Sequence, residues 1–333
     1  MKIIDVHNHL YPKDYMDYLS KGVGALSLQQ TGPGTMAFYY GGLRLATISK
    51  RGHYEWAPRV RDMEEYGIDV QMVSLTTPGV ELLPVKESVV WAKKVNDHIA
   101  AGCRKYKGRF YALATLPYGD VKASVKELER AHKELGAKGV TMFSNLAGDP
   151  IYLPKYLPIY EAAEALDMPI FIHPAPPLTT AAMKKARMPL PLYGFILDTT
   201  MAVTGLVFEG IFEKFPNLKV IHAHLGGVFP YMVGRVNDCY NTYHKDFGYS
   251  LTMPPSEYYK KNVYVDVISF HLPAMKCCLE YLGVDRLLIG TDYAHPIGGP
   301  QKVVGFVKQL GLPKAQFEKI MWKNAAKLFK LDA

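Results

Sequence analysis

Eight short apolar runs rich in β-branched residues, most of them separated by helical patterns, leave this chain very few folds to adopt. Apolar strands without polar alternation need cover on both faces, which is typical of a parallel sheet between helices. Eight such units within about 290 residues favour a closed (β/α)8 TIM barrel over an open doubly wound sheet, since no Gly-x-Gly-x-x-Gly follows the first run. The expected strands are residues 3–7, 70–75, 110–116, 139–143, 169–173, 219–223, 263–267 and 286–291, and the expected helices include 85–105, 121–135, 157–166, 200–215, 274–282 and an outer stretch at 314–331.

Two connections interrupt this α/β alternation. Residues 10–57 form a long insertion after the first strand and hold seven glycines, whereas residues 174–199 are rich in proline and threonine. Both connections begin at the carboxyl ends of strands, and barrels of this type carry their catalytic residues on that face. We expect both to cover the active site, the first as a lid, within a single domain spanning residues 1–333; plain surface decoration is the alternative.

Four of the runs end in side chains that bind metal ions. Because side chains alternate along a strand with a period of two, His7 and His9 should point to the same side and hold one ion between them. One His-x-His pair is weak evidence, but the same design recurs at later strand ends, and the carboxyl ends of parallel strands meet at one face. These endings are His7 and His9, His173, His222 with His224, and Asp292.

We interpret His7, His9, His173 and Asp292 as the ligands of one divalent cation. Three imidazoles and one carboxylate leave the ion a net positive charge and room for water or substrate, as a catalytic site requires. Zn²⁺ is the first choice, and Mn²⁺ is a competitor because geometry and availability decide occupancy. The alternatives are a packed core pair for His7 and His9 and a hydrogen-bonded strand end for His173.

Other polar residues near these strand ends are candidates for catalytic or supporting roles. His224, followed by Leu225-Gly226-Gly227, is our candidate general acid/base, since imidazole changes charge near neutral pH, and His222 on the same face is expected to be buried support. Asp5 fits either a carboxylate supporting His7 or a place in the barrel floor. His295 either touches the substrate or faces solvent.

Composition excludes several classes of protein. The net charge of +8 is spread over the helices rather than collected in blocks, which argues against nucleic-acid binding. No apolar run approaches the roughly 18 residues of a membrane span, and the first residues lack an apolar signal region, so we expect a cytoplasmic protein. The four cysteines have no Cys-x-x-Cys spacing, so we expect them to be reduced.

Longer stretches around these residues resemble the amidohydrolase superfamily, in particular the branch with aminocarboxymuconate-semialdehyde decarboxylase and related benzoate-type decarboxylases. The resemblance covers nearly the whole chain. Its carriers are Asp5-Val-His7-Asn-His9, Phe171-Ile-His173-Pro174, the stretch from His224-Leu-Gly-Gly to Arg235, and Gly290-Thr-Asp292-Tyr.

The resemblance implies roles for individual residues. It makes His224 the catalytic histidine and Arg235 a holder of a substrate carboxylate that reaches the neighbouring subunit's site, which implies a homodimer or higher homo-oligomer. Arg51, shortly before Trp56, resembles a second carboxylate-binding arginine. The fourth strand ends without the lysine that bridges two metals in the superfamily's dinuclear hydrolases, so one metal is expected.

These features together predict a metal-dependent, non-oxidative decarboxylase of a small aromatic or unsaturated carboxylic acid. The ion would stabilise the charge that develops as carbon dioxide leaves, and His224 with Asp292 would manage the proton. The alternative is a metal-dependent hydrolase or hydratase, in which His224 would activate water for attack on a carbonyl or a double bond. A non-catalytic binding protein on the same barrel is a third hypothesis.

Overall fold

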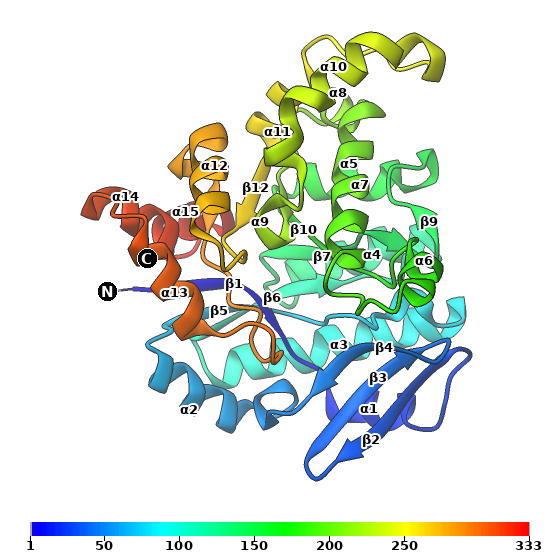
Figure 1. Cartoon of the computed structure of the whole chain (residues 1–333). Helices are drawn as coiled ribbons and strands as arrows, with labels where there is room; N and C mark the ends of the chain where they lie inside the picture. The colour runs from blue at the N-terminus through cyan, green and yellow to red at the C-terminus, as the bar shows by residue number, and fades with distance from the viewer. Residues whose placement is uncertain (1, 333) are drawn as a thin grey trace.

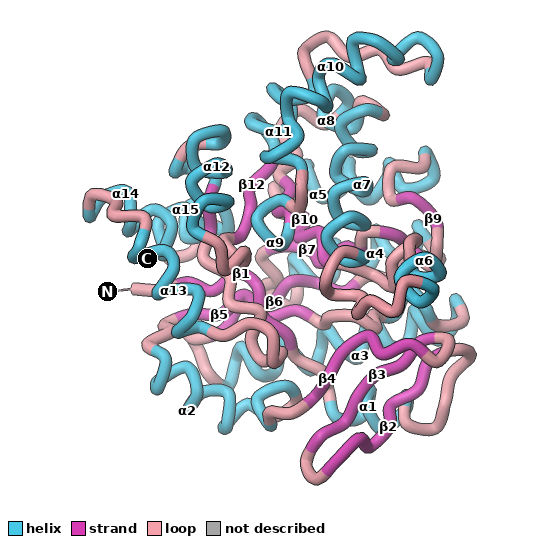
Figure 2. Tube along the Cα trace, in the orientation of Figure 1, coloured by secondary structure: helices cyan, strands magenta, loops and turns pink. Residues whose placement is uncertain are grey.

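The computed structural model describes residues 2–332 and contains the predicted TIM barrel. Eight strands lie side by side in one sheet, and every ladder between neighbouring strands is parallel. Helices surround these strands on the outside (Figures 1 and 2). The strands in spatial order are β1 (Ile4–His9), β5 (Val70–Ser74), β6 (Phe110–Thr115), β7 (Gly139–Phe143), β10 (Ile170–His173), β11 (Val220–His222), β12 (Val263–Asp266) and β13 (Leu287–Leu288).

The barrel closes between its last strand and β1. The amide of Val6 donates to the carbonyl of Ile289 at 3.0 Å, and the amide of His9 donates to the carbonyl of Tyr293 at 2.7 Å. The regular part of β13 is shorter than the predicted strand at 286–291, because its ladder with β12 ends at Leu288 and the residues after it bond to β1. The final strand therefore delivers its polar end directly beside β1.

The predicted helices are present, most of them with shifted bounds. The 85–105 helix is exact, whereas the helix predicted at 200–215 starts earlier and is broken by Gly210 in a left-handed conformation. The helices are α1 (Lys13–Leu19), α2 (Trp56–Tyr66), α3 (Val85–Lys105), α4 (Val121–Lys133), α5 (Leu157–Ala165), α6 (Thr180–Lys185), α7 (Gly194–Phe208), α8 (Ile211–Lys214), α9 (Ala223–Gly226), α10 (Phe229–Phe247), α11 (Pro255–Asn262), α12 (Leu272–Leu282), α13 (Pro300–Gln309), α14 (Lys314–Glu318) and α15 (Asn324–Phe329).

The insertion after β1 is a small folded unit rather than an irregular loop. It holds α1 and a three-stranded antiparallel sheet that stands beside the barrel in Figure 1. Its strands are β2 (Leu26–Gly32), β3 (Thr35–Tyr40) and β4 (Leu43–Ile48), and a short 3₁₀ turn, η1 (Arg51–His53), leads back to α2. The long insertion is confirmed, and its role as a lid stays a prediction.

Within residues 2–332 no helix combines the length and the apolar character that crossing a bilayer demands. The cysteines Cys103, Cys239, Cys277 and Cys278 are all free, as expected.

Candidate active site

The ends of β1 and β10 bring three histidines together. The ring centroids of His7 and His9 lie 4.8 Å apart, and the ring of His173 lies 5.3 Å from His7 and 4.8 Å from His9. One ring nitrogen from each residue falls within 4.8 Å of the others. All three side chains are buried at the carboxyl-terminal face of the barrel. Strand ends that are distant in sequence thus converge on one point.

Asp292 completes this group from the loop after β13. Its Oδ1 atom lies 3.0 Å from Nε2 of His9 and 3.5 Å from Nε2 of His7. Its backbone adopts the left-handed conformation, with φ at 56°, which is uncommon for a residue other than glycine and concentrates at functional sites. The amide of Asp292 donates to the carbonyl of His7 at 2.8 Å, so the closure of the barrel holds this turn against β1.

The histidines present lone pairs suited to a cation. Burial and the neighbouring histidines hold the pKa values of His9 and His173 well below the ordinary range, so both rings are neutral. His173 donates from Nδ1 to the carbonyl of Pro174 at 2.9 Å, which leaves the lone pair on Nε2. Nε2 of His7 is buried and has no hydrogen-bond partner within residues 2–332. The donor set therefore fits one divalent cation.

Asp266, at the end of β12, lies next to the candidate ligands and was missed by the sequence interpretation. Its Oδ2 atom accepts a hydrogen bond from Nδ1 of His7 at 2.7 Å, and both side chains are fully buried. Burial opposes a charge on His7, but Asp266 and the other nearby carboxylates outweigh it and raise the pKa of His7. Histidine ligands commonly donate their second N–H to a carboxylate in this way. The signal was available, since Val263–Asp266 is another apolar strand that ends in an acid.

His224 lies on a turn rather than on a strand, which corrects the interpretation that it shares a strand face with His222. β11 ends at His222, and His224 and Leu225 have φ values of 56° and 57°. Gly227 permits the tight turn that follows, because a Cβ there would collide with Thr200. The amide of Leu225 donates to Oδ1 of Asp266 at 3.2 Å, so Asp266 supports both this turn and His7.

The turn directs the ring of His224 to the metal-binding group. Its centroid lies 5.1 Å from that of His7, and a ring nitrogen lies within 4.8 Å of both a His7 nitrogen and an Asp292 oxygen. Nδ1 of His224 is buried without a hydrogen-bond partner among the described residues. Burial, and then His7, lower its pKa, so the ring is a neutral group beside the candidate metal centre.

Two further polar residues lie below this face. His222 is fully buried and its Nδ1 lies 2.8 Å from the hydroxyl of Tyr259, a supporting position. Asp5 accepts hydrogen bonds from the amide and hydroxyl of Thr291 at 3.0 and 2.7 Å, and from the amide of His7 at 3.2 Å. Burial raises the pKa of Asp5 to about 6. The Asp5 carboxylate thus links β1 to the segment that carries Asp292.

Arg59, on α2, also escaped the sequence interpretation. Its side chain is fully buried and donates from Nη1 to the carbonyl of His9 at 2.7 Å and from Nη2 to Oδ1 of Asn8 at 2.9 Å. An arginine in a helix with many charged residues gives no sequence signal of burial. In the structure Arg59 holds the backbone at the end of β1 that carries the candidate ligands His7 and His9.

The three predicted substrate-binding residues occupy different places. His295 lies beside the site, with its ring centroid 4.9 Å from that of His9. Arg51 is on the surface, where its side chain is 67% exposed and paired with Glu55. Arg235 is exposed on α10, without an ion pair within residues 2–332. Of the three residues, only His295 lies next to the candidate metal ligands of the same chain. Arg51 and Arg235 lie on the surface.

Comparison with known proteins agrees with this geometry. The family model described as Amidohydrolase matches residues 4–331. The chain belongs to the amidohydrolase family. A 2-amino-3-carboxymuconate-6-semialdehyde decarboxylase from Dictyostelium discoideum is 30% identical, over 99% of this chain and 92% of the relative. A gamma-resorcylate decarboxylase from Polaromonas sp. strain JS666 is 32% identical, over 82% of this chain and 87% of the relative.

A solved structure of similar fold extends the comparison to a bound metal ion. The 5-carboxyvanillate decarboxylase from Novosphingobium aromaticivorans superimposes with a TM-score of 0.87 and 25% identity, over 99% of this chain and 97% of that chain. That protein was crystallised with manganese and 3-methoxy-4-hydroxy-5-nitrobenzoic acid. The prediction of a carboxy-lyase of the amidohydrolase superfamily is confirmed at the level of the family. The buried His and Asp groups of this chain fit the predicted divalent metal. The choice of zinc, the cytoplasmic location and the dimer stay predictions.

Proposed function

We propose that this protein is a metal-dependent, non-oxidative decarboxylase of a small aromatic or unsaturated carboxylic acid. The observation that carries the proposal is that His7 and His9 lie close both to His173 and to Asp292 at the barrel mouth, with His224 close to His7 and Asp292. Its curated relatives are decarboxylases of such acids. A divalent cation bound by these four residues would supply positive charge that stabilises the anionic substrate as its carboxylate leaves.

The chain's own residues account for the proton. Breaking the bond between the substrate and its carboxylate releases carbon dioxide and leaves an electron pair on carbon, which takes up one proton. His224 can supply that proton by first taking one up from the medium and then delivering it as an imidazolium, which leaves the ring neutral again. Its ring nitrogen Nδ1 is buried and has no hydrogen-bond partner among the described residues, so it is free for this exchange. An oxygen of Asp292 lies within 4.8 Å of a ring nitrogen of His224. Asp292 can therefore share the proton with His224 during the transfer.

The backbone around His224 keeps the ring in place during this transfer. Asp266 accepts from the amide of Leu225 at 3.2 Å, and the amide of Val228 donates to the hydroxyl of Thr200 at 3.0 Å. A fixed acid lowers the cost of orientation at the transition state. The buried rings of the site also keep bulk water from the reacting carbon.

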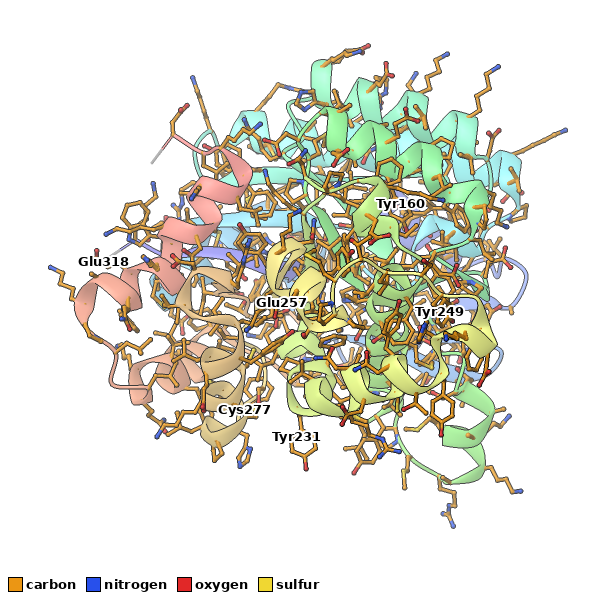
Figure 3. The ribbon with its side chains drawn as sticks, turned by 90° about the horizontal axis from the view of Figure 1, so that it is seen from above. Tyr160, Tyr231, Tyr249, Glu257, Cys277 and Glu318 are labelled. Atoms are coloured by element: carbon orange, nitrogen blue, oxygen red, sulfur yellow. The ribbon has the colours of Figure 1, made fainter. Side chains whose placement is uncertain are left out.

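We further propose that the second carboxylate or oxyanion of the substrate is held by Arg235 of a neighbouring subunit. Tyr231 lies one helical turn before Arg235 on α10, is 85% exposed and points away from the molecule in Figure 3. Residues four apart share a helix face, so Arg235 and an exposed tyrosine are presented together to a partner. Exposed tyrosine and arginine are both favoured in interfaces.

The test is direct measurement of carbon dioxide release. Metal-loaded protein is incubated with a panel of hydroxybenzoates and muconate semialdehydes, and chelated protein is the matched control. We expect release from at least one acid and none after chelation. Cleavage of a lactone or an amide, or hydration of an oxalo-dicarboxylate, without carbon dioxide release would support the hydrolase or hydratase instead.

A further inference from the structure

The turn η1, which ends the insertion, is fastened to the barrel through its backbone. The carbonyl of His53 accepts from the amide of Tyr11 at 2.7 Å, and the carbonyl of Gly52 accepts from Nη1 of Arg59 at 3.1 Å. A Cβ atom at Gly52 would collide with the ring of Tyr293, so only glycine allows this close approach. The turn is therefore docked without help from the side chain of His53.

That side chain makes a different contact. His53 is fully buried, and its Nε2 atom lies 3.3 Å from Nδ1 of His295, with the ring centroids 5.0 Å apart. Two neutral imidazoles form a hydrogen bond when the N–H of one faces the lone pair of the other. The pair joins the insertion to the loop after β13, across 242 positions of sequence.

His295 in turn lies beside the metal-binding group. One of its ring nitrogens falls within 4.8 Å of a His9 nitrogen and an Asp292 oxygen, and its amide donates to the carbonyl of Asp292 at 2.9 Å. Unlike His9, it is only partly buried. An oxygen of a molecule bound next to His9 and Asp292 would therefore lie close to this ring.

We propose that His53 is a positioning residue: it holds the imidazole of His295 in one orientation, in which His295 hydrogen-bonds an oxygen of the bound carboxylic acid. This inference rests on the proposed function. A free imidazole turns about two side-chain bonds, whereas one fastened at Nδ1 presents its remaining edge in a fixed direction. The insertion, which also places the backbone of Thr47 against His295, would thereby influence substrate selection.

Two substitutions of similar character separate positioning from packing. In His53→Gln the longer amide reaches the place of Nε2 and keeps a partner for His295, whereas in His53→Asn the shorter amide reaches only the place of Nδ1. We expect His53→Asn to lower kcat/KM about tenfold, as for the loss of one well-formed hydrogen bond, and His53→Gln to recover most of it. Metal content and Tm should be the same in both variants.

A double-mutant cycle shows whether the effect passes through His295. In a His295→Phe background, His53→Asn should lower kcat/KM by less than about twofold, since the two side chains act as one unit. Equal losses in both backgrounds, loss of metal in His53→Asn, or unchanged kcat/KM in that variant would overturn the inference.

Binding gives a readout that does not depend on turnover. The affinity of metal-loaded full-length protein for 3-methoxy-4-hydroxy-5-nitrobenzoic acid can be measured by calorimetry. We expect His53→Asn to bind this acid about tenfold more weakly than the wild type and His53→Gln to bind it nearly as well. An absence of decarboxylation in the wild type would refute the proposed function, whereas identical affinities of the wild type and His53→Asn would refute the positioning role.

Discussion

Asp266 and His7 form a fully buried pair in which Nδ1 of His7 donates to Oδ2 of Asp266 at 2.7 Å. The other oxygen of Asp266 accepts from the amides of Leu225 and Ile268 at 3.2 and 3.0 Å. One carboxylate thus orients a candidate metal ligand and also supports the turn that carries His224. Removing its charge should disturb both functions at once.

We predict that Asp266→Asn weakens metal affinity about 10- to 100-fold, the usual effect of losing a carboxylate behind a histidine ligand. The measurement is a competition titration with a chelator. Asp198→Asn is the matched control, because Asp198 is also buried but accepts from the amide of Leu178 and contacts none of the four ligands. The control should keep its metal affinity; an equal loss in both variants would contradict the role of Asp266.

His173→Ala should lose the metal ion and the activity together, because it removes one of four ligands from a single site. Elemental analysis after purification measures occupancy. His222→Asn is the control, since His222 is equally buried but bonds to Tyr259 away from the ligand group. Full occupancy in His173→Ala would remove its assignment as a ligand.

His224→Asn should retain the ion and lose turnover about 10²- to 10⁴-fold, the usual contribution of a general acid or base. Single-turnover measurements with metal-loaded protein test this. An unchanged rate would exclude His224 as the proton donor, and loss of the ion would make it a ligand instead.

Co-expression of His224→Asn with Arg235→Ala tests the contribution of a neighbouring subunit. If Arg235 serves the partner's site, a mixed dimer regains one site with both residues intact, and random mixing restores about a quarter of wild-type activity. A co-expressed sample no more active than the average of the two single variants would show that Arg235 does not act across an interface.

Stability should depend on pH through Glu81, a buried acid in the short 3₁₀ turn Val80–Leu82. Neither of its carboxyl oxygens has a hydrogen-bond partner in residues 2–332, and burial raises its pKa from 4.5 to about 8, although the nearby amides of Gly79 and Glu81 partly oppose the shift. Between these two pH values the folded state holds a proton that the unfolded state has lost. The free energy of unfolding therefore falls as pH rises, by up to about 1.4 kcal/mol per unit.

Glu81→Gln removes this dependence. The difference in Tm between this variant and the wild type should grow from pH 5 to pH 8. At the higher pH only the wild type must either bury the charge of Glu81 or keep its carboxyl protonated. Thermal unfolding of both proteins at the two pH values measures the difference. A constant difference in Tm would mean that Glu81 is not protonated in the folded state.

Sequence patterns were sufficient for the barrel and for the proximity of His7 and His9 to His173 and to Asp292, because polar residues at the ends of parallel strands must meet at one face. That these four residues bind a metal ion stays a prediction. They were not sufficient for His224, whose position depends on a left-handed turn held by Asp266. Contacts between distant loops, such as His53 with His295, leave no periodic signal at all. The buried Arg59 was missed because long charged side chains are usually exposed.

The most direct test of the central claim is the stoichiometry of carbon dioxide and product formed by metal-loaded protein from the best acid in the panel. The account predicts one carbon dioxide and one decarboxylated product for each substrate consumed, without an oxidant, and no reaction after the ion is removed by a chelator. Turnover that persists without the ion, or consumption of substrate without carbon dioxide, would contradict it.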